Sequence, residues 1–311
     1  MKKHSIALLL LLVLLTGCGA KTEEAPWQTA YRETGKYLQE QDALSAGSVG
    51  GEWAVIGLSR AGLLSDETAQ SYEQTVEDYV KQAGSVRLHH AKSTENSRAI
   101  LGLTAAGYNA ANMAGVDLTA GLTDMAYLRA QGTNGPIWAL IALDCHGYDI
   151  PQCADGEEQT TCEGLVAEIL SYQCSDGGWA LMGDESDVDM TAMALTSLAP
   201  YQEETDIKAA VDAALTYLSD AQQADGGFMS WGAANSESCA QVIVALTALG
   251  IDSAADSRFV KNGASPLDGL CAFACEGGGF RHSDEVWLPS RVSTHWPPAT
   301  ASGRARHACS T

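Results

Sequence analysis

A short glycine motif recurs along the chain and marks a repeating structural unit. Residues 173–179 read Gln-Cys-Ser-Asp-Gly-Gly-Trp, and residues 222–228 read Gln-Gln-Ala-Asp-Gly-Gly-Phe. A degenerate copy, Cys-Glu-Gly-Gly-Gly-Phe, occupies residues 275–280. Paired glycines accept positive φ angles and so end a helix, and a new helical pattern follows each of the first two turns. The chain is therefore predicted to repeat a unit of helix, glycine turn and helix.

Two kinds of helical segment alternate around these turns. The first kind is amphipathic with one charged face, and it is predicted at 31–41, 70–84, 122–131, 162–173, 207–222 and 267–275. The second kind is nearly uncharged and should be buried on most sides, and it is predicted at 52–64, 95–107, 137–148, 189–201 and 239–250. No stretch alternates as a β-strand does. The pattern predicts an all-α fold.

The first residues have the features of a targeting segment. Lys2 and Lys3 precede an apolar run over residues 6–15, which is too short to remain as a membrane span. The sequence Leu-Thr-Gly-Cys that ends at Cys18 resembles the bacterial lipobox. This resemblance implies a lipoprotein signal peptide over 1–17 and a lipid on the Cys18 sulfur. A plain secretory signal with an incidental cysteine is the alternative.

The expected location follows from that segment. Residues 18–26 are predicted to be a short tether, and the protein is predicted to be lipid-anchored on the extracytoplasmic side of a bacterial cell membrane. The chain carries 39 acidic and 18 basic residues, a formal net charge of −21. An acidic surface of this kind argues against binding to nucleic acid and against adsorption to anionic lipid by charge.

The composition changes abruptly after residue 285. The segment 286–311 contains no Asp or Glu, although a sixth buried helix is expected to follow His282. One permitted choice of codons for 286–297 and the start of codon 298, read from its third base, encodes Met-Ala-Thr-Glu-Gln-Gly-Leu-Tyr-Ala-Leu-Ala-Ala, a sequence typical of such a helix. We interpret 286–311 as an irregular tail caused by a frameshift and 27–285 as one domain. A genuine irregular C-terminus is the alternative.

The order of amphipathic helix, Gln-x-x-Asp-Gly-Gly-Trp/Phe and buried helix resembles the repeats of the terpenoid cyclase and protein prenyltransferase family. The resemblance covers nearly all of residues 27–280. It implies an α/α toroid of six helical hairpins, with outer and inner rings of helices and a ligand cavity at the inner-helix ends. Here the last inner helix would be missing or disrupted. Cobalamin carriers and complement-like thioester domains share this toroid, so the fold alone does not give the function.

One of the sequence motifs that resemble this family is a catalytic motif in the cyclases. Residues 187–192, Asp-Val-Asp-Met-Thr-Ala, are similar to the Asp-x-Asp-Asp-Thr-Ala motif of the cyclases, whose middle Asp donates the proton that starts cyclisation. The resemblance implies this role for Asp189, with Asp187 as the neighbouring carboxylate that keeps it protonated. Met190 departs from the motif. The alternative is structural: Ser186 and Asp189 form a capping box, and both Asp residues stabilise a helix start.

The remaining candidates are ligand contacts and cysteines. Asp187, Trp138, His146 and Trp231 are candidate ligand contacts. The alternative for Trp138 and Trp231 is that they are core aromatic residues, and the alternative for His146 is a structural role. The zinc motif of prenyltransferases is matched only by Glu-Ser-Cys at 237–239, so no metal and no other cofactor is expected. Cys153 and Cys162 could form a disulfide, and buried free thiols are the alternative.

These observations predict a cell-surface lipoprotein that binds a small, partly apolar ligand in the toroid. By resemblance, the ligand is an isoprenoid or a cobalamin-like compound. Two alternatives stay open: an isoprenoid-processing enzyme that uses Asp189 as its acid, and a structural adhesion repeat with no ligand.

Overall fold

The computed structural model describes residues 24–41, 44–48 and 50–283, and in this part of the chain the structure is predominantly helical. The predicted all-α fold is confirmed at this level. The signal segment with Cys18, most of the tether and the tail at 286–311 lie outside the described residues.

The two predicted kinds of helix are present and alternate along the chain. The outer helices, which keep an exposed charged face, are α2 (Pro26–Gln39), α4 (Asp66–Ala83), α6 (Met125–Arg129), α8 (Cys162–Ser171), α10 (Thr205–Ala221) and α12 (Pro266–Cys271). The inner helices, which are buried on most sides, are α3 (Gly51–Arg60), α5 (Thr94–Ala105), α7 (Asn134–Asp144), α9 (Val188–Leu198) and α11 (Ser236–Ala248). Short 3-10 turns lie at Ala110–Asn112, Leu118–Leu122 and Ala199–Tyr201.

Most predicted helix bounds differ from the structure by one to five residues, and three segments show the reasons. The first outer helix begins at Pro26, five residues before the predicted start, because proline suits the first helical position. The segment predicted at 122–131 contains only the short helix α6, preceded by a 3-10 turn. In the segment predicted at 267–275, helix α12 already ends at Cys271, because Ala274 pairs with Phe280 across the glycine turn.

The described residues also contain a small hairpin that was not predicted. Strands β1 (Met229–Ser230) and β2 (Ala233–Ala234) pair antiparallel, and Trp231 and Gly232 form the turn with φ of 51° and 81°. Positive φ at both central residues is typical of the tight hairpin turn. Strands of two residues are too short to show the alternation of apolar and polar residues by which a strand is recognised in a sequence.

The glutamine and aspartate of the repeated motif have defined structural roles. The side-chain amide of Gln173 donates to Gly177 O in its own turn (2.9 Å) and to Ala210 O in α10 (2.8 Å). Gln222 repeats this geometry with Gly226 O (3.1 Å) and Phe259 O (2.9 Å). Each motif carboxylate accepts a hydrogen bond from the second glycine N–H. The motif thus ties each glycine turn to the outer segment that follows it.

The first glycine of each motif is required by φ and by a close contact. Gly177 and Gly226 have φ of 91° and 88°. A Cβ on Gly177 would lie 2.8 Å from Ala213 O, and one on Gly226 would lie 2.2 Å from Ser265 O. These distances are too short for a side chain, so only glycine lets the turn approach the next outer segment.

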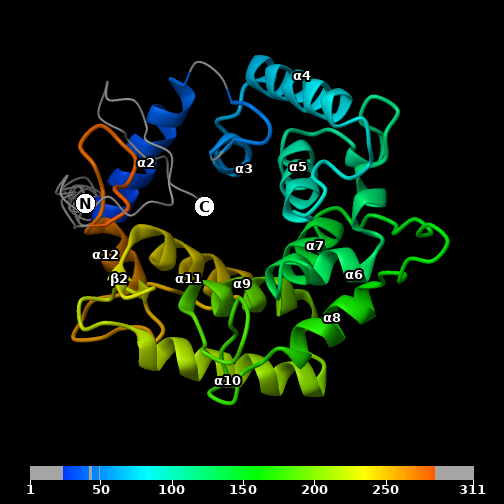
Figure 1. Cartoon of the computed structure of the whole chain (residues 1–311). Coiled ribbons are helices and arrows are strands. Elements are labelled where there is room, and N and C mark those ends of the chain that lie inside the picture. Colours follow the sequence, from blue (N-terminus) through cyan, green and yellow to red (C-terminus); the bar gives the residue numbers. More distant parts are fainter. Residues whose placement is uncertain (1–23, 42–43, 49, 284–311) are drawn as a thin grey trace, which may run out of the picture.

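The degenerate third copy packs on the first helix of the domain. Gly278 occupies the position of the first motif glycine, with φ of 100°, and its Cβ would lie 2.5 Å from Glu33 O in α2. Gly277 replaces the motif aspartate, and Gly279 N–H donates instead to Thr34 Oγ1 at 3.0 Å. Helices α2 and α12, from opposite ends of the described chain, are therefore neighbours (Figure 1).

The inner helices contact one another in chain order, from α3 to α11. Three links join their N-terminal ends, because the segment before one inner helix bonds to the start of the preceding one. Gln131 accepts a hydrogen bond from Thr94 N–H (3.0 Å), Leu181 O accepts one from Thr133 N–H (3.2 Å), and Asp187 accepts one from the Ser230 hydroxyl (2.5 Å). At the start of α11, Ser236 N–H donates in the same way to His282 O (3.0 Å). The starts of α5, α7, α9 and α11 consequently lie side by side.

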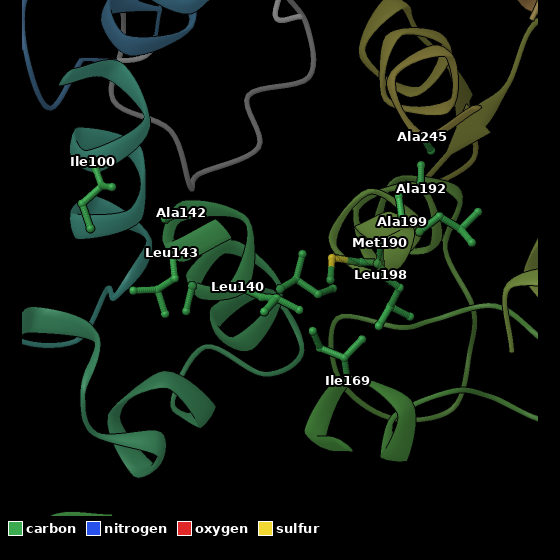
Figure 2. Packing of buried hydrophobic residues seen from close by; sticks show 14 of the residues in the cluster. Ile100, Leu140, Ala142, Leu143, Ile169, Met190, Ala192, Leu198, Ala199 and Ala245 are labelled. Atoms are coloured by element: carbon green, nitrogen blue, oxygen red, sulfur yellow. The ribbon is translucent and has the colours of Figure 1, made fainter. Parts of the chain in front are cut away.

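The hydrophobic core fills the space between neighbouring helices. Leu140 of α7, Ile169 of α8 and Met190 of α9 belong to one continuous cluster and lie close together in Figure 2. Small residues such as Ala192 and Ala245, fully buried between α9 and α11, allow the inner helices to pack closely.

We expect the motif glutamine to stabilise the domain measurably. Gln222→Ala removes two hydrogen bonds and leaves buried carbonyl oxygens without a donor, so it should lower the free energy of unfolding by about 2 kcal/mol or more. Gln223→Ala is the matched control, because this adjacent glutamine is exposed and should change stability by about 0.5 kcal/mol at most. Urea denaturation measures both, and equal effects would contradict the assigned role.

Candidate functional site

The start of α9 is organised by Asp187. Its Oδ1 accepts hydrogen bonds from the N–H groups of Asp189 (3.0 Å) and Met190 (3.1 Å), and its Oδ2 accepts one from the Ser230 hydroxyl. Asp187 is therefore the N-cap, and the predicted capping box with Ser186 is wrong. The Ser186 hydroxyl donates instead to Asp176 at 2.6 Å, because the loop turns it back towards the glycine motif.

Asp189 lies in the first turn of α9 without capping it. The residue is half-buried, and its Oδ1 is buried with no hydrogen-bond partner. Burial raises the pKa of Asp189, and the negative charges of Asp187 and Glu237 raise it further. The arrangement has the two features expected of an acid held in its protonated form, a desolvated position and a neighbouring carboxylate.

Residues of α11 and the hairpin complete the surroundings of Asp189. The hydroxyls of Ser238 and Ser230 favour its charged form and partly oppose the rise in pKa. Ser238 is fully buried beside Asp189. We call Asp187, Asp189 and Ser238 the α9 cluster.

A second acidic group lies at the starts of α3 and α5. Glu52 is almost fully buried, accepts a hydrogen bond from Gly47 N–H at 2.6 Å, and has its pKa raised chiefly by burial. Arg98 lies between two carboxylates, 3.8 Å from Glu52 and 2.7 Å from Glu95. The Tyr79 hydroxyl also donates to Glu95 at 3.3 Å. This group contains its own compensating positive charge.

Trp138 is one of two tryptophans that meet near the inner-helix starts. Its ring centroid lies 5.1 Å from that of Trp53, at an interplanar angle of 58°. The two residues come from α7 and α3, on either side of α5, and both are half-buried. Trp138 is thus a partly accessible aromatic residue rather than a fully enclosed core residue.

The structure does not bring His146 and Trp231 together with Trp138. His146 is exposed beyond the C-terminal end of α7, where its ring lies 5.3 Å from that of Tyr148. Trp231 stands at the tip of the hairpin with 87% of its surface exposed. Only its neighbour Ser230 reaches the α9 cluster.

The described cysteines are unpaired, so the disulfide considered between Cys153 and Cys162 is not formed and the free-thiol alternative holds. Burial raises the pKa of Cys239 to about 11, which disfavours the thiolate that zinc requires. Within residues 24–41, 44–48 and 50–283, no group of three His, Cys, Asp or Glu side chains could hold a metal ion.

Each inner helix is half-exposed along one narrow stripe. The stripe residues recur every three or four positions, as one helix face requires. They include Trp53 and Ile56, Arg98 and Leu101, Trp138 and Ile141, Asp189 and Met193, and Gln241 and Val244. On α9 this stripe continues from Asp189 to Met193 and Thr196. A separate pocket of about 250 Å³, lined by Ser59, Asp66 and Ala105 among others, contains none of the predicted site residues.

Comparisons with known proteins leave the function open. The sequence matches no protein-family model, and no curated protein has a significantly similar sequence. In the described part of the chain, no helix combines the length and apolarity needed to cross a membrane.

Substitutions at Asp187 and Asp189 should separate their roles. Asp187→Ala should lower the free energy of unfolding by about 1–2 kcal/mol, because it removes the N-cap acceptor. Ser186→Ala should cost less. If Ser186→Ala were the more damaging change in urea denaturation, the cap assignment would be wrong.

Asp189→Asn should instead show a dependence on pH. Below the unfolded-state pKa of about 3.9 the carboxyl is protonated in both states. Because the folded pKa is raised, the folded state binds the proton more tightly above that pH, and wild-type stability falls as pH rises. We expect Asp189→Asn to gain stability relative to wild type between pH 4 and pH 7 in urea denaturation. A constant difference across this range would contradict the raised pKa.

Proposed function

We propose that this protein is a lipid-anchored, extracytoplasmic binding protein whose helices form an α/α toroid. Two features support the toroid. The inner helices contact one another in order with their N-terminal ends linked, and the last glycine turn packs on α2 as the earlier turns pack on the next outer segments. Within the described residues, the circle of contacts closes through α12 and α2.

The ligand is a small, partly apolar molecule that lies against the inner helices. The observation that carries this proposal is the half-exposed stripe, because helices that are otherwise buried expose apolar side chains along one face only. A concave, largely apolar surface with a few convergent polar groups is typical of small-molecule sites. An isoprenoid and a cobalamin-like compound are the two candidates that the resemblance offers.

Binding is tested by calorimetric titration of the purified protein with farnesol and with cyanocobalamin. We expect saturable binding of one of them and at least tenfold weaker binding by Met193→Trp, which fills the stripe on α9. Ala209→Trp is the control, because it places the same side chain on the exposed face of α10. Equal loss in both variants, or no saturable binding to wild type, would contradict the proposal and favour the structural adhesion alternative.

A second candidate function is acid catalysis on an isoprenoid by Asp189. The specific observation in its favour is the raised pKa of a half-buried carboxyl with an unpartnered oxygen. A cyclised product formed from squalene by wild type and lost in Asp189→Asn would establish this function over simple binding.

The lipid anchor rests on the sequence that ends at Cys18 and is tested separately. Expression in a bacterial host with a palmitate analogue should label the wild-type protein, and Cys18→Ala should abolish the label. Labelling that survives this substitution would show that the sulfur of Cys18 does not carry the lipid.

A further inference from the structure

Two large hydrophobic side chains are exposed on α2, the first outer helix (Figure 1). Trp27 has 41% of its surface exposed and Tyr31 has 58%. The two residues are four positions apart, so they follow each other by one turn on the same helix face. The other large hydrophobic side chains that are exposed in the described part of the chain lie in loops or in the hairpin. Among the described outer helices, α2 alone therefore carries such a surface, and we call Trp27 and Tyr31 the α2 patch.

The charge of α2 also differs from that of the two longest outer helices. Arg32 and Lys36 outnumber Glu33, and Glu24 forms an ion pair with Arg32 just before the helix, so this region is neutral. By contrast, α4 carries a net charge of −4 and α10 a net charge of −2. Salt screens charges over about 8 Å, so the local charge governs a contact. The repulsion from anionic surfaces that the acidic composition predicts does not apply at α2.

The α2 patch is close along the chain to the proposed site of lipid attachment. Cys18 precedes Pro26, the first residue of α2, by eight residues. Eight residues span at most about 28 Å, whatever their conformation. A compact domain of about 260 residues is about 45 Å across. Because the connection is shorter than the domain is wide, a lipid on Cys18 would keep the side that carries the start of α2 towards the bilayer.

The residue types of the patch suit a bilayer surface. Tryptophan and tyrosine each combine an apolar ring with one polar group, and both are enriched where membranes meet water. Arg32 and Lys36 are exposed on the same helix. Long basic side chains of this kind lay their stems along apolar surface and keep their charged ends in the polar layer.

From these observations we infer that the α2 patch is the surface by which the anchored domain contacts the membrane, with the rings of Trp27 and Tyr31 in the head-group region. The occupant of the patch is thus a lipid surface, rather than residues 284–311 or a second copy of the chain. This inference rests on the lipid anchor of the proposed function, and it adds which side of the domain faces the membrane.

The contact is tested with the lipidated full-length protein in phosphatidylcholine vesicles, either plain or brominated near the head-group end of the acyl chains. Bromine quenches tryptophan fluorescence only at short range. We expect the brominated lipid to lower wild-type emission, and Trp27→Phe to remove about half of this loss or more, because the ring of Trp27 lies in the lipid head groups. The same loss in wild type and in Trp27→Phe would overturn the inference.

Two further variants, both made in the Trp27→Phe protein, locate the contact. Tyr31→Trp places the fluorophore one turn along the patch and should restore the quenching. Ala209→Trp is the matched control, because it places the same side chain on the exposed face of α10, and it should restore none. Equal quenching of the two would mean that lipid approaches the domain without preference for α2, against the inference.

The remaining outcomes separate this inference from the anchor on which it rests. A wild-type protein that carries the palmitate-analogue label but is not quenched by the brominated lipid would leave the anchor standing. In that case residues 284–311 or a second copy would cover the α2 patch, and the inference would be wrong. A protein that carries no label would remove the anchor and the inference with it, while the proposed ligand binding at the inner helices is judged by its own titration.

Discussion

The close approach of each glycine turn to the next outer segment is the interaction on which the rest of the domain depends. It requires a glycine with positive φ, since a Cβ at Gly177 or Gly226 would collide with a backbone carbonyl. The motif glutamine then bridges the turn and the neighbouring carbonyl with one amide. In the third copy Thr34 supplies the acceptor that the missing aspartate would have provided. The same contact thus connects successive repeats and joins the last repeat to the first helix.

This arrangement explains where polar residues gather. Because the loops before α7, α9 and α11 bond to the starts of the preceding inner helices, the N-terminal ends of α5, α7, α9 and α11 are held together. Those ends expose backbone N–H groups and favour acidic side chains, which explains Glu52, Asp189 and Glu237 in first turns. Tight packing buries the remaining faces and leaves one stripe on each helix half-exposed. The repeat geometry therefore places the acidic groups at one end of a largely apolar surface.

Much of this architecture could be predicted from the sequence, since the glycine motif and the alternation of charged and uncharged helices are local patterns. The Ser186–Asp189 spacing suggests a capping box at α9, but Asp187 caps the helix, because spacing alone does not determine which side chain faces the helix N–H groups. Ser238 gave no signal as a site residue, since its proximity to Asp189 arises only when α9 and α11 pack together. Trp231 is an exposed turn residue because the two-residue hairpin that holds it is too short to be detected.

The electrostatics of Asp189 decide whether it can serve as an acid. An acid must keep its proton, and burial and the charges of Asp187 and Glu237 favour that state. The hydroxyls of Ser238 and Ser230 act in the opposite direction, because hydrogen bonds to a carboxylate favour its charged form. Burial is the largest of these effects, so the pKa of Asp189 is raised even though two hydroxyls lie beside it. The packing of α9 against α11 therefore supplies both the desolvation that holds the proton and the serine that opposes it.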